Sequence, residues 1–345
     1  MTATAHAVVW RGGRDFDTVE IPLPEPGPGE TLVRLTAATV CGSDRHTVNG
    51  RREAPCPSVL GHEGVGVVVS TNGGHLVDGS PVSPGTRVVF GVARSCGRCE
   101  ICMRGLTAKC TSVQKVGHES FESDWPLSGT YASHILLREG QAVVPVPSSL
   151  DDGVAATAGC AVATVMAVLE RAGDLSGRRV LVNGLGMLGL VAVAAARRRG
   201  AAAIIAVDPN AARFGLAQGL GATPVSSETG DAGTVDVSLE LSGSPTGTRS
   251  CIDALGIGGT AVLAGSVSPV GATEVDPEWI VRGWRTITGV HNYEPRHLQE
   301  AVEFLESVGD DIPWKDILDG PIMADQLAEE FRRNDVQRLR TVVRM

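Results

Sequence analysis

Short apolar runs, separated by turns rich in glycine and proline, dominate the first part of the chain. They occupy residues 6–9, 31–37, 64–70, 87–90 and 132–136, and the segment PLPEPGPGE is one of the turns between them. Short runs bounded by such turns are typical of β-strands. The pattern therefore predicts a twisted all-β domain over residues 1–150.

The pattern changes after Pro147. Helical spacing over residues 151–171 is followed by strand-like segments at 179–183, 203–207, 235–241 and 260–264, with helix-like segments at 187–199, 211–219 and 246–255 between them. Strands that alternate with helices are the sequence form of βαβ units and a parallel sheet. We therefore predict a second, doubly wound α/β domain over residues 151–290.

The last part of the chain, residues 291–345, is predicted to return to the first domain. An apolar strand at 285–290 precedes it, helical spacing covers 297–307 and 324–333, and an apolar strand at 339–344 follows. We expect this last strand to join the sheet of the first domain. The predicted fold class is therefore α/β, with a β domain and a parallel-sheet domain.

Charge and length argue against several classes of function. The formal net charge is −9, with 30 basic and 39 acidic side chains spread along 345 residues. Because no basic stripe is present, nucleic acid is not the expected partner. The longest apolar stretch, residues 188–196, is too short for a bilayer span, and the segment MTATAHAVVWRGG lacks the pattern of a secretion signal. We expect a cytoplasmic enzyme without a membrane partner.

A glycine motif follows the first strand of the predicted parallel sheet. The segment NGLGMLG gives GxGxxG immediately after that strand, and it opens an alanine-rich helix. Such glycines permit a tight turn, let backbone N–H groups approach a pyrophosphate and allow the helix to pack on the strand. The residues predicted to bind a dinucleotide in this loop are Gly184, Gly186, Met187, Leu188 and Gly189.

An acidic residue ends the next strand. Asp208 stands where a carboxylate can accept hydrogen bonds from an adenosine ribose, and it would repel a 2′-phosphate. The predicted cofactor is therefore NAD rather than NADP. Arg213, shortly after Asp208, either contacts the same ribose or is a solvated helix residue.

Four of the eight cysteines form a compact pattern. Cys96, Cys99, Cys102 and Cys110 are spaced Cys-x2-Cys-x2-Cys-x7-Cys. Four thiolates can enclose one zinc ion in a tetrahedron that leaves no position for substrate, so the expected site is structural. The alternative is an iron–sulfur cluster, but the last interval is longer than in the bacterial pattern and no proline follows the fourth cysteine.

Three further residues suggest an open metal site. Cys41 and His62 flank predicted strands, and Cys160 lies in the helical segment that begins the second domain. Two thiolates and one imidazole give zinc three protein ligands and leave a fourth position for a substrate oxygen. Cys56 and Cys251 remain, and we interpret both as small buried or idle thiols.

Four neighbours of these ligands are candidates for supporting roles. Asp44 could orient His62, and Glu63 could lie behind the metal or act as a transient ligand, although either could be an ordinary surface carboxylate. Ser43 and His46 could carry a proton.

Together these motifs resemble the zinc-containing medium-chain dehydrogenase/reductase family of the alcohol dehydrogenase type. CGSDRH, VLGHEGVGVV, the cysteine lobe at 91–125, TAGCAVAT and the glycine-motif segment occur in the family's order over nearly the whole chain. The resemblance implies a GroES-like domain that carries the catalytic zinc and is interrupted in sequence by a Rossmann domain, with the active site between them. It implies the catalytic zinc ligands Cys41, His62 and Cys160, with Glu63 nearby, Asp44 behind the histidine, and a proton relay through Ser43 and His46.

The resemblance also implies a reaction and partners. We expect two zinc ions per chain, NAD, a small alcohol or carbonyl substrate, and a homodimer or homotetramer, because 285–290 matches a strand that often pairs across a dimer. Residues 289–306 resemble a bacterial subgroup of phosphonate-catabolism-associated alcohol dehydrogenases, and an anionic substrate would suit Arg45, Arg51, Arg52, His291 and Asn292. The alternatives are a polyol or sugar dehydrogenase, a non-catalytic nucleotide-binding protein of the same fold, and a zinc-free reductase, which lacks the ligand triad.

Overall fold

The computed structural model describes residues 3–226, 232–333 and 338–345, and it divides into two compact units. Unit 1 comprises Met1–Ala163, Asn292–Gly309 and Trp314–Met345, and unit 2 comprises Thr164–His291 and Asp310–Pro313. The domain boundary predicted at residue 150 comes earlier in the chain than the boundary between the units, which follows Ala163. The reason is that helix α3 (Asp152–Ala156) packs on strands β3 and β5 of unit 1.

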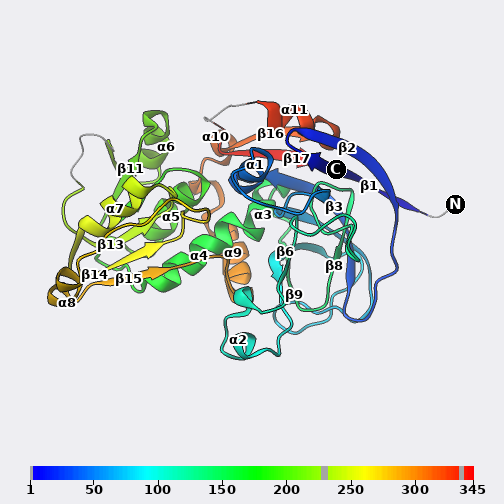
Figure 1. The fold of residues 1–345 in the computed structure, drawn as a ribbon, viewed down its shortest axis with the longest axis horizontal. Coiled ribbons are helices and arrows are strands. Elements are labelled where there is room, and N and C mark those ends of the chain that lie inside the picture. Colours follow the sequence, from blue (N-terminus) through cyan, green and yellow to red (C-terminus); the bar gives the residue numbers. More distant parts are fainter. Residues whose placement is uncertain (1–2, 227–231, 334–337) are drawn as a thin grey trace. The chain divides into compact units, whose positions relative to one another are not determined.

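Unit 1 is built on an extended, largely antiparallel sheet (Figure 1). Its order is β16 (Leu318–Met323), β17 (Arg340–Arg344), β3 (Thr31–Val40), β5 (Gly64–Thr71), β6 (Arg87–Arg94) and β7 (Gln114–Lys115). In addition, β8 (His134–Leu137) pairs with β3, and β9 (Gln141–Pro145) pairs with β6. Strand β17 pairs antiparallel with β3, so the prediction that the last strand joins the first domain is confirmed.

A smaller sheet lies within the same unit. It has the order β2 (Asp15–Pro22), β1 (Thr4–Gly12) and β4 (Ser58–Val59). The core of unit 1 is closed by large side chains that water does not reach, among them Leu35, Phe90, Trp125, Tyr131 and Ile135. Burial of this apolar surface is the main force that holds the strands together.

The helices of unit 1 are α1 (Gly42–Val48), α2 (Glu100–Met103), α3, the start of α4 (Ala161–Ala172), α9 (Pro295–Val308), α10 (Trp314–Ile317) and α11 (Leu327–Arg332). Most of them are short, and α9 is the exception with 14 residues. The prediction of one continuous helix over residues 151–171 was wrong. A 3₁₀ turn (Thr157–Gly159) follows α3, and Cys160 adopts φ −139° before α4 begins. Tight packing explains the break, since a Cβ on Gly159 would lie 3.1 Å from the carbonyl oxygen of Phe90.

Unit 2 contains a parallel sheet with helices on its faces (Figure 1). The strand order is β12 (Thr223–Ser226), β11 (Ala203–Asp208), β10 (Arg179–Asn183), β13 (Val235–Glu240), β14 (Leu255–Leu263) and β15 (Thr286–Gly289). The helices are α5 (Met187–Arg198), α6 (Phe214–Gly219), α7 (Pro245–Asp253) and α8 (Pro277–Gly283). This order, with its switch between β10 and β13, is that of the predicted doubly wound domain.

Three details of unit 2 differ from the prediction, and the first is strand β12, which was not predicted. Strand β14 begins at Leu255, within the predicted helix, because α7 ends at Asp253. Helix α8 was not predicted, although Asp276 caps it with a side-chain hydrogen bond to the amide of Glu278 and Pro277 occupies its first turn. No single helix of the described residues is long and apolar enough to cross a membrane, although the bent pair Asp152–Gly159 and Ala161–Ala172 passes that test together.

Candidate functional site

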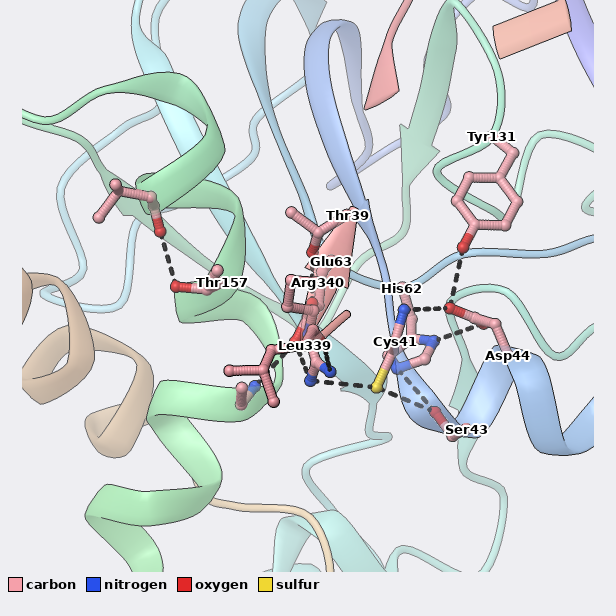
Figure 2. Close-up of polar contacts among 12 residues, drawn as sticks. Thr39, Cys41, Ser43, Asp44, His62, Glu63, Tyr131, Thr157, Leu339 and Arg340 are labelled. Atoms are coloured by element: carbon pink, nitrogen blue, oxygen red, sulfur yellow. Dashed lines mark hydrogen bonds and ion pairs between the residues drawn. The ribbon is translucent and has the colours of Figure 1, made fainter. Parts of the chain in front are cut away.

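The three residues of the predicted open metal site meet in unit 1. Cys41 follows β3 as the N-cap of α1, His62 lies in the turn before β5, and Cys160 occupies the break before α4. Their ligand atoms all lie within 4.8 Å of one another. Figure 2 shows Cys41 and His62 side by side. A tetrahedral zinc ion fits such a set of two thiols and one imidazole.

His62 is oriented by Asp44. Nδ1 of His62 lies 3.2 Å from Oδ1 of Asp44, and neither atom has another hydrogen-bond partner among the described residues. Oδ2 of Asp44 accepts hydrogen bonds from the amide of Cys41 and the hydroxyl of Tyr131, both at 2.9 Å. Asp44 is therefore a buried residue of the site and not a surface carboxylate. With Nδ1 turned to Asp44, Nε2 remains for a metal.

Glu63 is fully buried behind Cys41. Its carboxylate accepts hydrogen bonds from Nε of Arg340 at 3.0 Å, from the amide of Ala161 at 3.0 Å and from the hydroxyl of Thr39. Nη2 of Arg340 also donates to Sγ of Cys41 at 3.4 Å, as Figure 2 shows. Burial raises the pKa of Glu63, and the positive charge of Arg340 opposes that rise.

The two thiols differ in acidity. The hydrogen bond from Cys160 holds the pKa of Cys41 well below its ordinary value, against the effect of burial and with help from Arg340 and His62. The same hydrogen bond, together with burial, raises the pKa of Cys160. Burial alone would lower the pKa of His62, but the charges of Asp44 and Cys41 raise it well above its ordinary value. A metal ion binds the deprotonated forms of all three side chains, so its binding would release protons from Cys160 and His62.

The predicted proton-relay residues both lie on α1. Ser43 Oγ is 3.2 Å from Nε2 of His62 and donates to Sγ of Cys41 at 3.3 Å. His46 lies about one turn further along the helix. Burial lowers the pKa of His46, and the neighbouring charge of Arg51 lowers it further, so its imidazole is neutral and able to accept a proton.

Arg45 is not available for an anionic substrate. Its Nη2 lies 2.5 Å from Oε1 of Glu330, a buried carboxylate on α11 that also accepts a hydrogen bond from Thr341. Sequence reasoning could not detect this pairing because Arg45 and Glu330 are far apart along the chain.

Three residues near the metal site were missed by the sequence analysis: Arg340, Tyr131 and His118. The ring of His118 is 5.3 Å from that of His62, and its Nδ1 has no partner among the described residues. Burial holds the pKa of His118 well below its ordinary value, and the charges of His62, Arg52 and Lys115 add to this effect. None of the three belongs to a motif, so no sequence signal marked them.

The four clustered cysteines also meet, with all four sulfur atoms within 4.8 Å of one another. Backbone amides point at the sulfurs: Cys96 donates to Cys110, Cys99 to Cys96 and Cys102 to Cys99, at 3.3 to 3.5 Å. Amide hydrogen bonds from Thr111 and Cys102 lower the pKa of Cys99 to about 5, whereas burial raises that of Cys102 to about 12. This closed set of thiols fits a tetrahedral zinc ion.

The glycine loop of unit 2 has the close approaches that the motif predicts. A Cβ on Gly184 (φ +97°) would lie 2.7 Å from the amide nitrogen of Ser242, and one on Gly189 would collide with the carbonyl of Gly184. Gly186, by contrast, faces open space and is the N-cap of α5, whose first two residues are Met187 and Leu188. An open helix N-terminus is a suitable place for a pyrophosphate.

Asp208 lies beside this loop. Its Oδ2 accepts a hydrogen bond from the amide of Leu185 at 2.6 Å, and Nη1 of Arg213 is 3.4 Å from the same oxygen. Arg213 is therefore held next to Asp208 rather than solvated freely. Glu240, at the end of the adjacent β13, was missed by the sequence analysis. It accepts hydrogen bonds from the amides of Ser242 and Gly243 at 2.8 Å and so shapes the neighbouring loop.

Comparison with known proteins gives consistent results. The family model described as "Alcohol dehydrogenase GroES-like domain" matches residues 27–148, and that described as "Zinc-binding dehydrogenase" matches 188–307. The 5-exo-hydroxycamphor dehydrogenase of Pseudomonas putida is 29% identical over 94% of each chain. An L-threonine 3-dehydrogenase of Shewanella woodyi is 31% identical over 80% of this chain and 81% of its own. The crystal structure of an alcohol dehydrogenase from Thermotoga maritima superposes with a TM-score of 0.87, at 27% identity and 99% coverage of both chains.

Proposed function

The chain belongs to the zinc-binding alcohol dehydrogenase family, whose members are oxidoreductases acting on CH–OH groups, and on this basis we propose that it is an NAD-linked dehydrogenase with a catalytic zinc at Cys41, His62 and Cys160. The observation that carries the proposal is the convergence of these three ligand atoms within 4.8 Å. The four-cysteine cluster would hold a second, structural zinc.

The proposed mechanism assigns a role to each side chain around the metal. Cys41, Cys160 and His62 would hold the zinc ion, and Asp44 fixes the ring of His62. The bound ion would supply a Lewis acid for the substrate oxygen. Ser43 receives the hydroxyl proton of the alcohol, and His46, kept neutral by its lowered pKa, passes the proton to solvent. Bound NAD would supply its nicotinamide as the acceptor of the carbinol hydride.

Asp208 supports NAD as the dinucleotide. Its carboxylate lies at the end of β11 beside the glycine loop, where it would accept hydrogen bonds from ribose hydroxyls. A 2′-phosphate at the same place would meet its negative charge. Two backbone amides and Arg213 hold the carboxylate of Asp208 at this place.

The charges around the site favour a substrate with an anionic group. Arg51 acts electrostatically on His46, and Arg52 and Lys115 act on His118. Arg52 also lines an open cavity of about 840 Å³ together with Trp10 and Thr47, although the three metal ligands are not among its lining residues. A neutral polyol is the second candidate, since Nδ1 of His118, which has no hydrogen-bond partner in the part of the chain that the structure describes, would suit a substrate hydroxyl.

The test of this function is zinc content together with NADH formation. We expect two zinc ions per chain in the wild type, and Cys41→Ser should lose one of them and all measurable turnover. Cys56→Ser, which changes an exposed thiol of the same unit, is the matched control and should keep both ions. Full activity of Cys41→Ser with one zinc would refute the assignment.

A substrate panel tests the finer proposal. Hydroxyalkyl phosphonates and hydroxy acids should exceed uncharged alcohols of equal length in kcat/KM by about tenfold, or about 1.4 kcal/mol in the barrier. Arg52→Gln should remove most of this preference without changing turnover of the uncharged alcohol. Preference of the wild type for neutral polyols would instead support the second candidate.

A further inference from the structure

Tyr131 occupies an unusual position for a fully buried tyrosine. It lies outside the metal ligands and the relay, but its hydroxyl donates to Oδ2 of Asp44 at 2.9 Å. The other oxygen of Asp44 is the one that faces Nδ1 of His62 at 3.2 Å. Figure 2 shows the resulting line of side chains, Tyr131 to Asp44 to His62.

The ring of Tyr131 also fixes the turn that presents His62. Gly61 has φ +86°, and a Cβ there would lie 2.7 Å from Cε1 of Tyr131. The amide of Tyr131 donates to the carbonyl of Leu60 at 3.1 Å. On its other side, the ring meets Phe331 edge-on with centroids 6.1 Å apart. The tyrosine therefore has little freedom to move away from Asp44.

We propose that Tyr131 is a positioning residue that tunes the metal centre through Asp44, an inference that rests on the proposed catalytic zinc. A hydrogen bond to Oδ2 draws negative charge away from the carboxylate, so Asp44 attracts the Nδ1 proton of His62 less strongly. The imidazole then donates less electron density to the metal, which is a stronger Lewis acid than it would be without the hydrogen bond from Tyr131. Burial and the charge of Asp44 raise the pKa of Tyr131, so the phenol keeps the proton that it donates.

The chain is well suited to a test because it contains two tyrosines, Tyr131 and Tyr293. Tyr131→Phe removes one oxygen atom and leaves the ring. In a Tyr293→Phe background, biosynthetic replacement of tyrosine by 3,5-difluorotyrosine alters Tyr131 alone and makes its hydroxyl a stronger donor. Tyr293→Phe itself is the matched control, since it removes a buried hydroxyl whose partners are Gly159 and Val92.

The measurement is the ¹H NMR resonance of the His62 Nδ1 proton in the zinc-loaded, ¹⁵N-histidine-labelled enzyme. Tyr131→Phe should move it downfield and difluorotyrosine should move it upfield, while Tyr293→Phe leaves it unchanged. We expect kcat of Tyr131→Phe to fall on the order of tenfold. If Tyr131 had only a structural role, its two replacements would not move the His62 resonance in opposite directions.

Zinc analysis of the same samples separates the two proposals. A wild type that binds one zinc per chain would overturn the proposed function and this inference with it. Two zinc ions with a His62 resonance that neither replacement of Tyr131 moves would overturn the inference alone. The fluorinated protein keeps the ring and the hydroxyl of Tyr131 and is compared with Tyr293→Phe, so the test does not depend on the folding of Tyr131→Phe.

Discussion

Glu63 and Arg340 form an ion pair that water does not reach, pressed against the sulfur of Cys41. The positive charge of Arg340 lies next to the sulfur of Cys41, and the negative charge of Glu63 lies next to Arg340. Taking two charges out of water is costly, and the cost is recovered only when each has close partners. Here Thr39 and the amide of Ala161 complete the partners of Glu63.

We predict that Glu63→Gln lowers the free energy of unfolding by about 3–5 kcal/mol, because it leaves Arg340 buried without its carboxylate. Arg340→Met should cost a similar amount, whereas the double variant should lose clearly less than the sum. Urea denaturation monitored by circular dichroism measures all three. Additive losses would contradict a direct coupling of the two side chains.

The candidate ligands were predictable from residue type and spacing, but their supports were not. Cysteines and histidines in metal-binding patterns are rare enough to be noticed in a sequence. Arg340, by contrast, reaches the site through the pairing of β17 with β3, and Tyr131 reaches it through a hydrogen bond to Asp44, which is far away in the sequence. No local sequence pattern indicates such long-range contacts. Only the folded structure therefore shows which arginine and which tyrosine contact the metal site.

The loop that carries the four cysteines has little regular secondary structure. It contains the short helix α2 and a 3₁₀ turn (Thr107–Lys109), and Met103 at the end of α2 is 75% exposed. Amides point at its sulfur atoms, and Glu294 accepts hydrogen bonds from the amides of Thr107 and Ala108. A segment of this kind is held mainly by its metal, as in small zinc-dependent domains.

We therefore predict that chelation of zinc makes residues 91–125 the first site of proteolytic cleavage, while unit 2 stays intact. Limited trypsin digestion with mass spectrometry would locate the cuts, and Arg98 and Arg104 lie within the loop. Cys99→Ser should show the same cleavage without chelator. Cleavage that begins in unit 2 would count against a structural role for this metal.

At the level of elements, hydrophobic periodicity was a good guide where the strands are buried on both faces. Strand β10 and helix α5 begin where the sequence predicted, because an apolar run and a glycine loop mark them clearly. The break at Cys160 and helix α8 escaped prediction for a different reason. The break results from packing against Phe90, and α8 is half exposed, so neither leaves a strong hydrophobic pattern.

At the level of the whole molecule, the parallel sheet of unit 2 ends at an uncovered strand. β15 is the last strand in the order, and Val281 and Trp284 just before it are 71% and 83% exposed. Exposed apolar side chains beside an edge strand are typical of surfaces that pair with another chain. We propose that two copies of the protein associate through this edge.

We predict that the wild type sediments as a dimer or a larger assembly, and that Trp284→Asp converts it to monomers because two introduced charges would face each other. Met103→Asp, which changes a comparably exposed apolar residue of the cysteine loop, is the control and should leave the assembly intact. Analytical ultracentrifugation distinguishes the outcomes. A wild-type monomer would exclude the proposed association.

The pairing of β17 with β3 has a consequence for synthesis of the protein. Cys41, His62, Glu63 and Cys160 all leave the ribosome before unit 2 is made, whereas Arg340 emerges after it. During that interval the carboxylate of Glu63 has no guanidinium beside it. Since nascent domains fold as units in the order of translation, the metal centre is completed only after the dinucleotide-binding unit has been made.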